Sequence, residues 1–183
     1  MKQENLTTVV ANEEIDNKKL ARAKKIIHEL YQELPDYIAR GHGPFLAAIY
    51  DEVGHLIAKE ANSVVLGLNS DNHAEMNTIH FAEKFLNTYD LSPYNLSLFV
   101  TAEPCIMCLG GIMWSGIKNV YFGVPSKSVE SITGFDEGFK PNWLKEFKKR
   151  GITVYGNIDT KYGEKVLQQY MEQKHIVYKP TRN

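Results

Sequence analysis

The sequence predicts an α/β sandwich, because short strand-like runs alternate along the chain with longer helix-like runs. The first helix is predicted over residues 17–34 and ends or kinks at Pro35, since proline interrupts helical hydrogen bonding. Its apolar residues recur at three- and four-residue steps, which defines one buried face: Leu20, Ala23, Ile27, Leu30 and Leu34.

The strands are predicted from short apolar runs that are bounded by turn residues. Residues 45–50 and 56–61 indicate a hairpin, with Gly54 at the exit of its turn. Further strands are expected over residues 96–101, 119–123 and 152–155. Helices are expected from His73 onward, from Cys105 onward, and over residues 142–150 and 162–174.

Length and charge limit the class of protein. A chain of 183 residues with 43% hydrophobic content is long enough for one domain with a sizeable core. The formal net charge of −1 argues against a nucleic-acid partner, and the basic runs at residues 18–25 and 145–150 favour solvated helix faces. The sequence shows neither a signal-peptide pattern nor a membrane-spanning segment, so no membrane is expected. Its two cysteines favour a reducing cytoplasm.

The chemistry is carried by His73 and Glu75 in an H-x-E motif, followed by Cys105 and Cys108 in a P-C-x-x-C motif. Two thiolates and one neutral imidazole bind Zn²⁺ and leave the fourth tetrahedral position open for water. Zinc lowers the pKa of a bound water to about 7. Glu75, two residues beyond the histidine, is placed to take the water proton as a general base.

Two other interpretations of the cysteine pair were weighed. A C-x-x-C motif in an intracellular protein also occurs in redox proteins and in half of a structural zinc site. A structural site needs four protein ligands, whereas this set offers three and a carboxylate. A redox role leaves His73 and Glu75 without a function. The catalytic zinc site is therefore the favoured hypothesis.

The motif pair is the signature of zinc-dependent nucleobase deaminases, so the chain resembles the cytidine deaminase-like superfamily, and guanine deaminase-type purine deaminases most of all. This resemblance implies a three-layer α/β/α sandwich with a central five-stranded mixed sheet and both zinc helices on one face. It divides a single domain, residues 1–183, into an N-terminal helical extension (1–40), a catalytic core (41–160) and a C-terminal helix and tail (161–183).

The same resemblance implies the substrate contacts. Asn62 would hydrogen-bond a purine base and Phe45 would lie against its face. Trp114, six positions after Cys108, would wall the pocket. Glu137, in the segment Gly134-Phe135-Asp136-Glu137-Gly138, would contact the base edge and assist proton transfer, with Asp136 as its rival. Ala74 and the tail residue Tyr178 complete the expected contacts.

Without the resemblance, these residues keep ordinary alternatives. Phe45 and Trp114 could be packing residues, and Asn62 could be a turn residue. The acidic pair could be a solvated turn. With the resemblance, the favoured function is hydrolysis of an amino-purine, guanine to xanthine and ammonia, and the resemblance also implies a homodimer whose tail crosses to the partner. The alternatives are a tRNA-specific adenosine deaminase, a deaminase of guanosine or ammeline, and a non-enzymatic zinc module.

Overall fold

The structure is a computed structural model, and it describes residues 16–140 and 142–179. Its centre is a five-stranded mixed sheet in the order β2-β1-β3-β4-β5. The strands are β1 (Leu46–Tyr50), β2 (Leu56–Ala61), β3 (Ser97–Ala102), β4 (Asn119–Val124) and β5 (Thr153–Tyr155). Strand β1 pairs antiparallel with β2 and β3, whereas β4 pairs parallel with β3 and β5. The predicted mixed sheet is confirmed.

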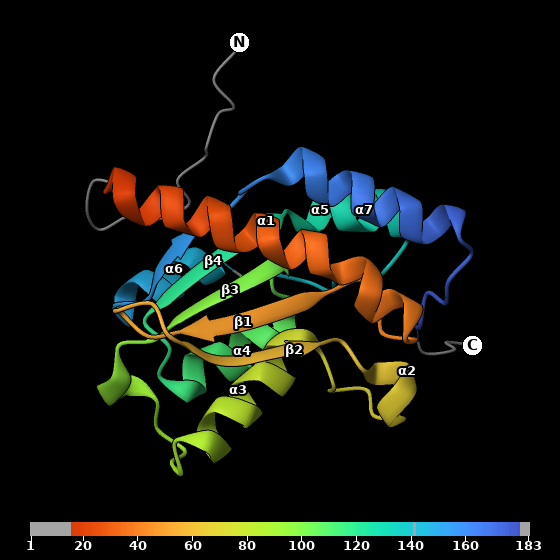
Figure 1. The fold of residues 1–183 in the computed structure, drawn as a ribbon. Coiled ribbons are helices and arrows are strands. Elements are labelled where there is room, and N and C mark those ends of the chain that lie inside the picture. The colour runs from red at the N-terminus through yellow and green to blue at the C-terminus, as the bar shows by residue number, and fades with distance from the viewer. Residues whose placement is uncertain (1–15, 141, 180–183) are drawn as a thin grey trace.

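Helices cover both faces of the sheet (Figure 1). Helices α1 (Asn17–Ala39), α5 (Ser126–Thr133) and α7 (Thr160–Glu172) lie over one face. Helices α3 (Ala74–Phe85) and α4 (Ile106–Ser115) lie over the other, and α6 (Trp143–Lys149) lies near β5. The α/β/α sandwich, with both expected zinc helices on one face, is therefore confirmed.

Helix α1 departs from its predicted end. It runs through Pro35 to Ala39 and does not stop at Leu34, so Pro35, which was expected to end or kink the helix, does not end it. The buried face continues past the proline, because Leu34 and Ile38 are both buried. Burial of that face outweighs the one backbone hydrogen bond that proline removes.

Tyr31 fixes α1 to the part of the sheet that leads into the site. Its hydroxyl donates to the Thr101 carbonyl at 2.6 Å and accepts from the Val124 N–H at 3.1 Å. A Cβ added to Gly123 would meet this hydroxyl at 1.9 Å, so only glycine allows the approach. These two hydrogen bonds hold the C-terminal ends of β3 and β4 in place, next to the candidate site described below.

Three short elements were not predicted: α2 (Val64–Gly67), the 3₁₀ helix η1 (Ser92–Tyr94) and α5. In α5 the buried side chains are Ser126, Val129 and Thr133, of which one is apolar. A helix of this kind has almost no apolar periodicity to detect, because its buried face is mostly hydroxyl groups. No helix of the described residues is both long enough and apolar enough to cross a membrane.

Candidate metal centre and active site

The three expected metal ligands come from the starts of α3 and α4. His73 is the N-cap of α3 and Cys105 is the N-cap of α4, each in extended backbone conformation. Their carbonyls accept the first helical hydrogen bonds, from Asn77 and Leu109, both at 2.9 Å. In the described chain neither side chain caps its own helix, so both are available to the site.

The three ligand atoms form a compact triangle. The Cys105 and Cys108 sulfurs lie 3.6 Å apart, and the Nδ1 atom of His73 lies 3.5 Å and 3.6 Å from them. Zn–S bonds of about 2.3 Å and a Zn–N bond of about 2.0 Å at tetrahedral angles give edges of about 3.8 Å and 3.5 Å. The chain therefore supplies one face of a zinc tetrahedron, which leaves the fourth vertex outside this set of protein ligands.

Electrostatics within the triangle favour metal binding. The hydrogen bond with Cys108 lowers the pKa of Cys105 to about 4 against the effect of burial, and His73 lowers it further. The same hydrogen bond and burial raise the pKa of Cys108. One thiolate thus already exists beside a second thiol, and a divalent cation in contact with both would ionise the second as well.

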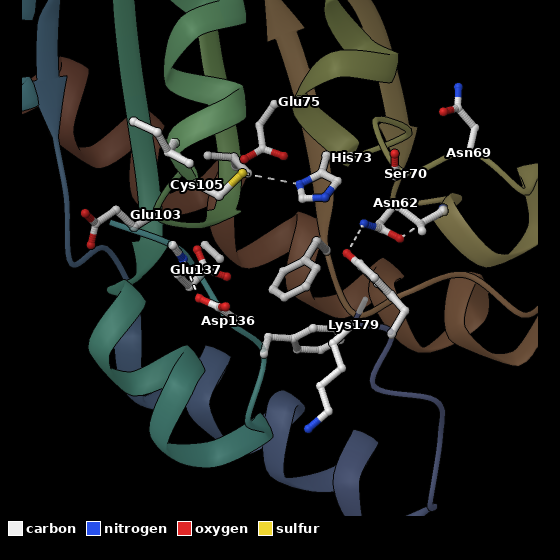
Figure 2. A pocket seen from close by; sticks show the side chains of 18 of the residues that line it. Asn62, Asn69, Ser70, His73, Glu75, Glu103, Cys105, Asp136, Glu137 and Lys179 are labelled. Atoms are coloured by element: carbon white, nitrogen blue, oxygen red, sulfur yellow. Dashed lines mark hydrogen bonds between the residues drawn. The ribbon is translucent and has the colours of Figure 1, made fainter. Parts of the chain in front are cut away.

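Glu75 lies directly behind the triangle, in the first turn of α3. It is buried, at 6% exposure. Burial and then the nearby Cys105 raise its pKa above the usual range for glutamate. Figure 2 shows its carboxylate pointing toward Cys105 and His73. A carboxyl group with a raised pKa, close to the open vertex, is suited to accept and return a proton.

A pocket of about 690 Å³ opens in front of these residues. Aromatic rings form part of its wall. The ring of Phe135 packs edge-on against Phe45 at 5.4 Å and against Tyr178 at 5.0 Å between centroids. The pocket also exposes His73 and Glu75. Flat apolar walls with polar groups at one end are what an aromatic heterocycle requires.

Asn62 lies in this pocket and is held by backbone and side-chain bonds. Its amide nitrogen donates to the Tyr178 hydroxyl at 2.7 Å, and its Oδ1 accepts from the Val64 N–H at 3.3 Å. A Cβ on Gly43 would meet Oδ1 at 2.7 Å, so glycine at this position allows the close approach. Asn62 and Tyr178, distant in sequence, are therefore brought together, within one chain.

The loop after α5 contributes two acidic residues to the pocket lining, Asp136 and Glu137. Asp136 is exposed and accepts from the Gly138 N–H at 2.9 Å, whereas the Glu137 side chain is only 11% exposed. Burial raises the pKa of Glu137 to about 8, against an opposing effect of Lys140. Of the two acidic side chains, that of Glu137 is therefore the one more shielded from solvent.

Two expected contacts are placed elsewhere. Among the described residues, the pocket lining does not include Trp114 or Ala74. Trp114 is 82% exposed at the far end of α4 and borders a separate hollow of about 340 Å³. Ala74 is fully buried, and its carbonyl accepts from the Thr78 hydroxyl at 2.6 Å. Within a single chain, Trp114 therefore does not line this pocket.

Sequence reasoning missed Phe135, Glu103 and Lys140. The ring of Phe135 packs against both Phe45 and Tyr178. Glu103, which directly precedes Pro104, also lines the pocket. Lys140 lies 3.2 Å from Glu103. The segment around Glu137 was recognised, but no local pattern indicates that its phenylalanine meets Phe45 or that its lysine meets a residue 37 positions earlier.

The comparisons agree with this geometry. The family model of the cytidine and deoxycytidylate deaminase zinc-binding region matches residues 20–124. The chain therefore belongs to that family. A tRNA-specific adenosine deaminase of Buchnera aphidicola subsp. Baizongia pistaciae is 34% identical over 60% of this chain and 72% of its own length. Guanine deaminase of Bacillus subtilis is 36% identical over 53% of this chain and 60% of its own length.

A solved structure in complex with 2,6-diaminopurine has a TM-score of 0.80 and 32% identity, covering 92% of this chain and 97% of that one. Fold, motif and relatives together define a deaminase, a zinc-dependent hydrolase acting on C–N bonds. The expectation of zinc held by His73, Cys105 and Cys108 is confirmed. Of the other classes weighed, the redox protein and the non-enzymatic zinc module are set aside.

Proposed function

We propose that the chain deaminates an amino-purine base, with guanine converted to xanthine and ammonia. The observation that carries this proposal is a pair of carboxyl groups, buried Glu75 and largely covered Glu137, in one aromatic-walled pocket with His73 and Cys105. Guanine offers an N1–H and a 2-amino group as adjacent donors, which a carboxylate accepts together. Adenine has no such pair on that edge.

Each residue has a defined task in the proposed reaction. Bound zinc supplies a water of lowered pKa, and His73, Cys105 and Cys108 hold the metal. Glu75 accepts the water proton on its carboxylate, passes it to a ring nitrogen and later delivers a proton to the departing amino group. The reaction consumes one guanine and one water and releases one xanthine and one ammonia.

The remaining residues bind and orient the base. Phe45, Phe135 and Tyr178 provide flat surfaces that exclude water from the two ring faces. Asn62 presents a donor and an acceptor to the base through its amide. In its ionised form Glu137 accepts from the base edge, and a pKa of about 8 suits it to exchange a proton near neutral pH.

The test is a substrate panel. Purified zinc-loaded protein is incubated with guanine, guanosine, adenine, cytidine and ammeline while ammonia is measured. We expect the highest kcat/KM with guanine. Turnover of cytidine alone would overturn the assignment of the pocket. A higher kcat/KM with guanosine or ammeline than with guanine would change the proposed substrate but leave the proposed contacts with the base edge in place.

A tRNA adenosine deaminase is the second candidate, because such relatives are as similar to this chain as guanine deaminase is. The net charge of −1 argues against a tRNA partner, whose binding requires cations to neutralise phosphates. Inosine formation in tRNA, with binding that weakens steeply with salt, would favour this candidate over guanine.

We also propose that two copies form a homodimer in the cytoplasm. Aromatic side chains of α3 and α4 are exposed in the single chain: Phe81 at 47%, Phe85 at 65% and Trp114 at 82%. Exposed aromatic groups of this size favour a protein partner, and both metal-binding thiols need a reducing compartment. Light scattering is expected to give twice the chain mass of 20.8 kDa. A monomer at micromolar concentration would refute the dimer.

A further inference from the structure

Around Glu137 lies a cluster of charged and hydroxyl side chains, of which only Glu137 has a task in the proposed function. It consists of Glu103, Ser126, Glu137 and Lys140. The side chains of the three charged members are only 11% to 16% exposed. The four members of the cluster come from three segments, namely the β3–α4 connection, the start of α5 and the loop after α5. Partly buried charges of this kind are costly unless they are paired.

The contacts run in one direction. Lys140 Nζ lies 3.2 Å from Glu103 Oε1 and donates to the Ser126 hydroxyl. Ser126 Oγ in turn donates to Glu137 Oε2 at 3.5 Å, and Lys140 Nζ lies 3.9 Å from the same oxygen. The Ser126 N–H donates to Glu103 Oε2 at 2.9 Å. Glu103 thereby holds the lysine, and the lysine and serine hold one oxygen of Glu137.

This arrangement separates the two oxygens of Glu137. Oε2 is engaged on the protein side, so Oε1 is left for the pocket that Glu137 lines. The positive charge of Lys140 also offsets the repulsion that the carboxylates of Glu103 and Glu137 would otherwise exert on each other. Figure 2 shows Glu103 and Glu137 at the same side of the pocket, away from Asn62.

We propose that Lys140 is a positioning residue for Glu137, anchored by Glu103 and acting partly through Ser126. The inference rests on the proposed function, in which Glu137 contacts the base. It assigns a specific consequence to the cluster. Without Lys140 the Glu137 carboxylate turns away from the base edge, and substrate recognition is lost while the metal triangle stays intact.

A double-mutant cycle tests the coupling. Lys140→Met is expected to lower kcat/KM for guanine about 100-fold, and about threefold or less when Glu137→Gln is already present, because residues that act as a unit are not additive. Lys140→Arg should restore most of the rate. Lys127→Met, an exposed lysine on α5, is the matched control and should leave kcat/KM unchanged. A full 100-fold loss in both backgrounds would overturn the proposal.

Ser126→Ala provides a second variant that keeps every charge. It is expected to lower kcat/KM about tenfold in the parent protein and to have little effect beside Glu137→Gln, since one hydrogen bond is removed from the same oxygen. An unchanged rate for Ser126→Ala would remove the serine from the proposal, and an unchanged rate for Lys140→Met would overturn it.

A crystal structure of zinc-loaded Lys140→Met is the readout that needs no substrate. We expect the Glu137 carboxylate to leave its place while His73, Cys105 and Cys108 keep theirs. If Glu137 stays in place, the positioning inference fails whatever the substrate is. If Glu137 moves but the parent protein deaminates none of the purines tested, the proposed function fails and the positioning role stands.

Discussion

The two ends of helix α4 were expected to serve the same pocket, but they lie in different surroundings. At the N-terminal end, Cys105 and Cys108 meet His73 within 3.6 Å. At the C-terminal end, Trp114 is exposed and borders a separate hollow. By contrast, Tyr178 comes from the far end of the chain and contacts Asn62 at 2.7 Å.

The difference follows from helix geometry. Six residues of α-helix advance about 9 Å along the axis, because each residue rises about 1.5 Å. Trp114 is therefore carried away from Cys108 by the same rigid element that fixes the cysteine pair. A helix fixes the distances between residues that are close in the sequence. It also prevents residues at its two ends from contacting the same small ligand.

The largest expected effect concerns proton transfer beside the metal ligands, tested with Glu75→Gln in the first turn of α3. Removing the proton carrier should lower kcat about 10²- to 10⁴-fold, because general acid–base catalysis contributes that much. The metal ligands are unchanged, so zinc content, measured by elemental analysis, should stay at one per chain. Glu83→Gln on the same helix is the control. Loss of zinc, or a kcat within tenfold of the parent, would contradict this role.

The next effect is a pH-dependent change in stability caused by Glu137. Burial, with Lys140 opposing it, raises the pKa of this carboxyl from 4.5 to about 8 in the folded chain. Between these values the folded state keeps a proton that the unfolded state releases, so the free energy of unfolding falls as pH rises. The loss is complete above pH 8 and absent below about pH 4, where both states are protonated.

Glu137→Gln should therefore stabilise the metal-free protein by roughly 3 to 5 kcal/mol at pH 8.5, and by almost nothing near pH 4. Urea unfolding followed by circular dichroism between these two pH values measures the difference. A stability difference that does not change with pH would show that burial does not raise the pKa of Glu137.

A smaller effect is expected at the long-range contact between Asn62 and Tyr178. Asn62→Ala should raise KM for guanine about 30-fold with a smaller change in kcat, because one buried amide no longer bonds the base. Tyr178→Phe keeps the ring and removes only the hydroxyl, so its KM should rise less than tenfold. Steady-state kinetics separate the two variants. Equal effects would mean that the amide acts only through the tyrosine.

These contrasts show which features of the molecule depend on residues close together in the sequence and can therefore be predicted from it. His73, Cys105 and Cys108 were found because they stand in two short motifs, and the structure places these motifs at the starts of α3 and α4. The five strands were found from short apolar runs. The contacts of Phe135 with Phe45 and of Lys140 with Glu103 join loops across the fold, and their residues carry no periodic signal.

The smallest expected effect is that of Trp114→Ala. Because Trp114 lies outside the pocket of its own chain, kcat/KM for guanine should stay within about twofold of the parent. Trp143→Phe is not a suitable control, since Trp143 is buried, whereas Tyr89→Ala removes an aromatic side chain that is 89% exposed. A loss of tenfold or more would mean that Trp114 enters the pocket of a neighbouring copy. Rates measured across a dilution series would then fall with the dimer, and the two ends of α4 would serve two different active sites.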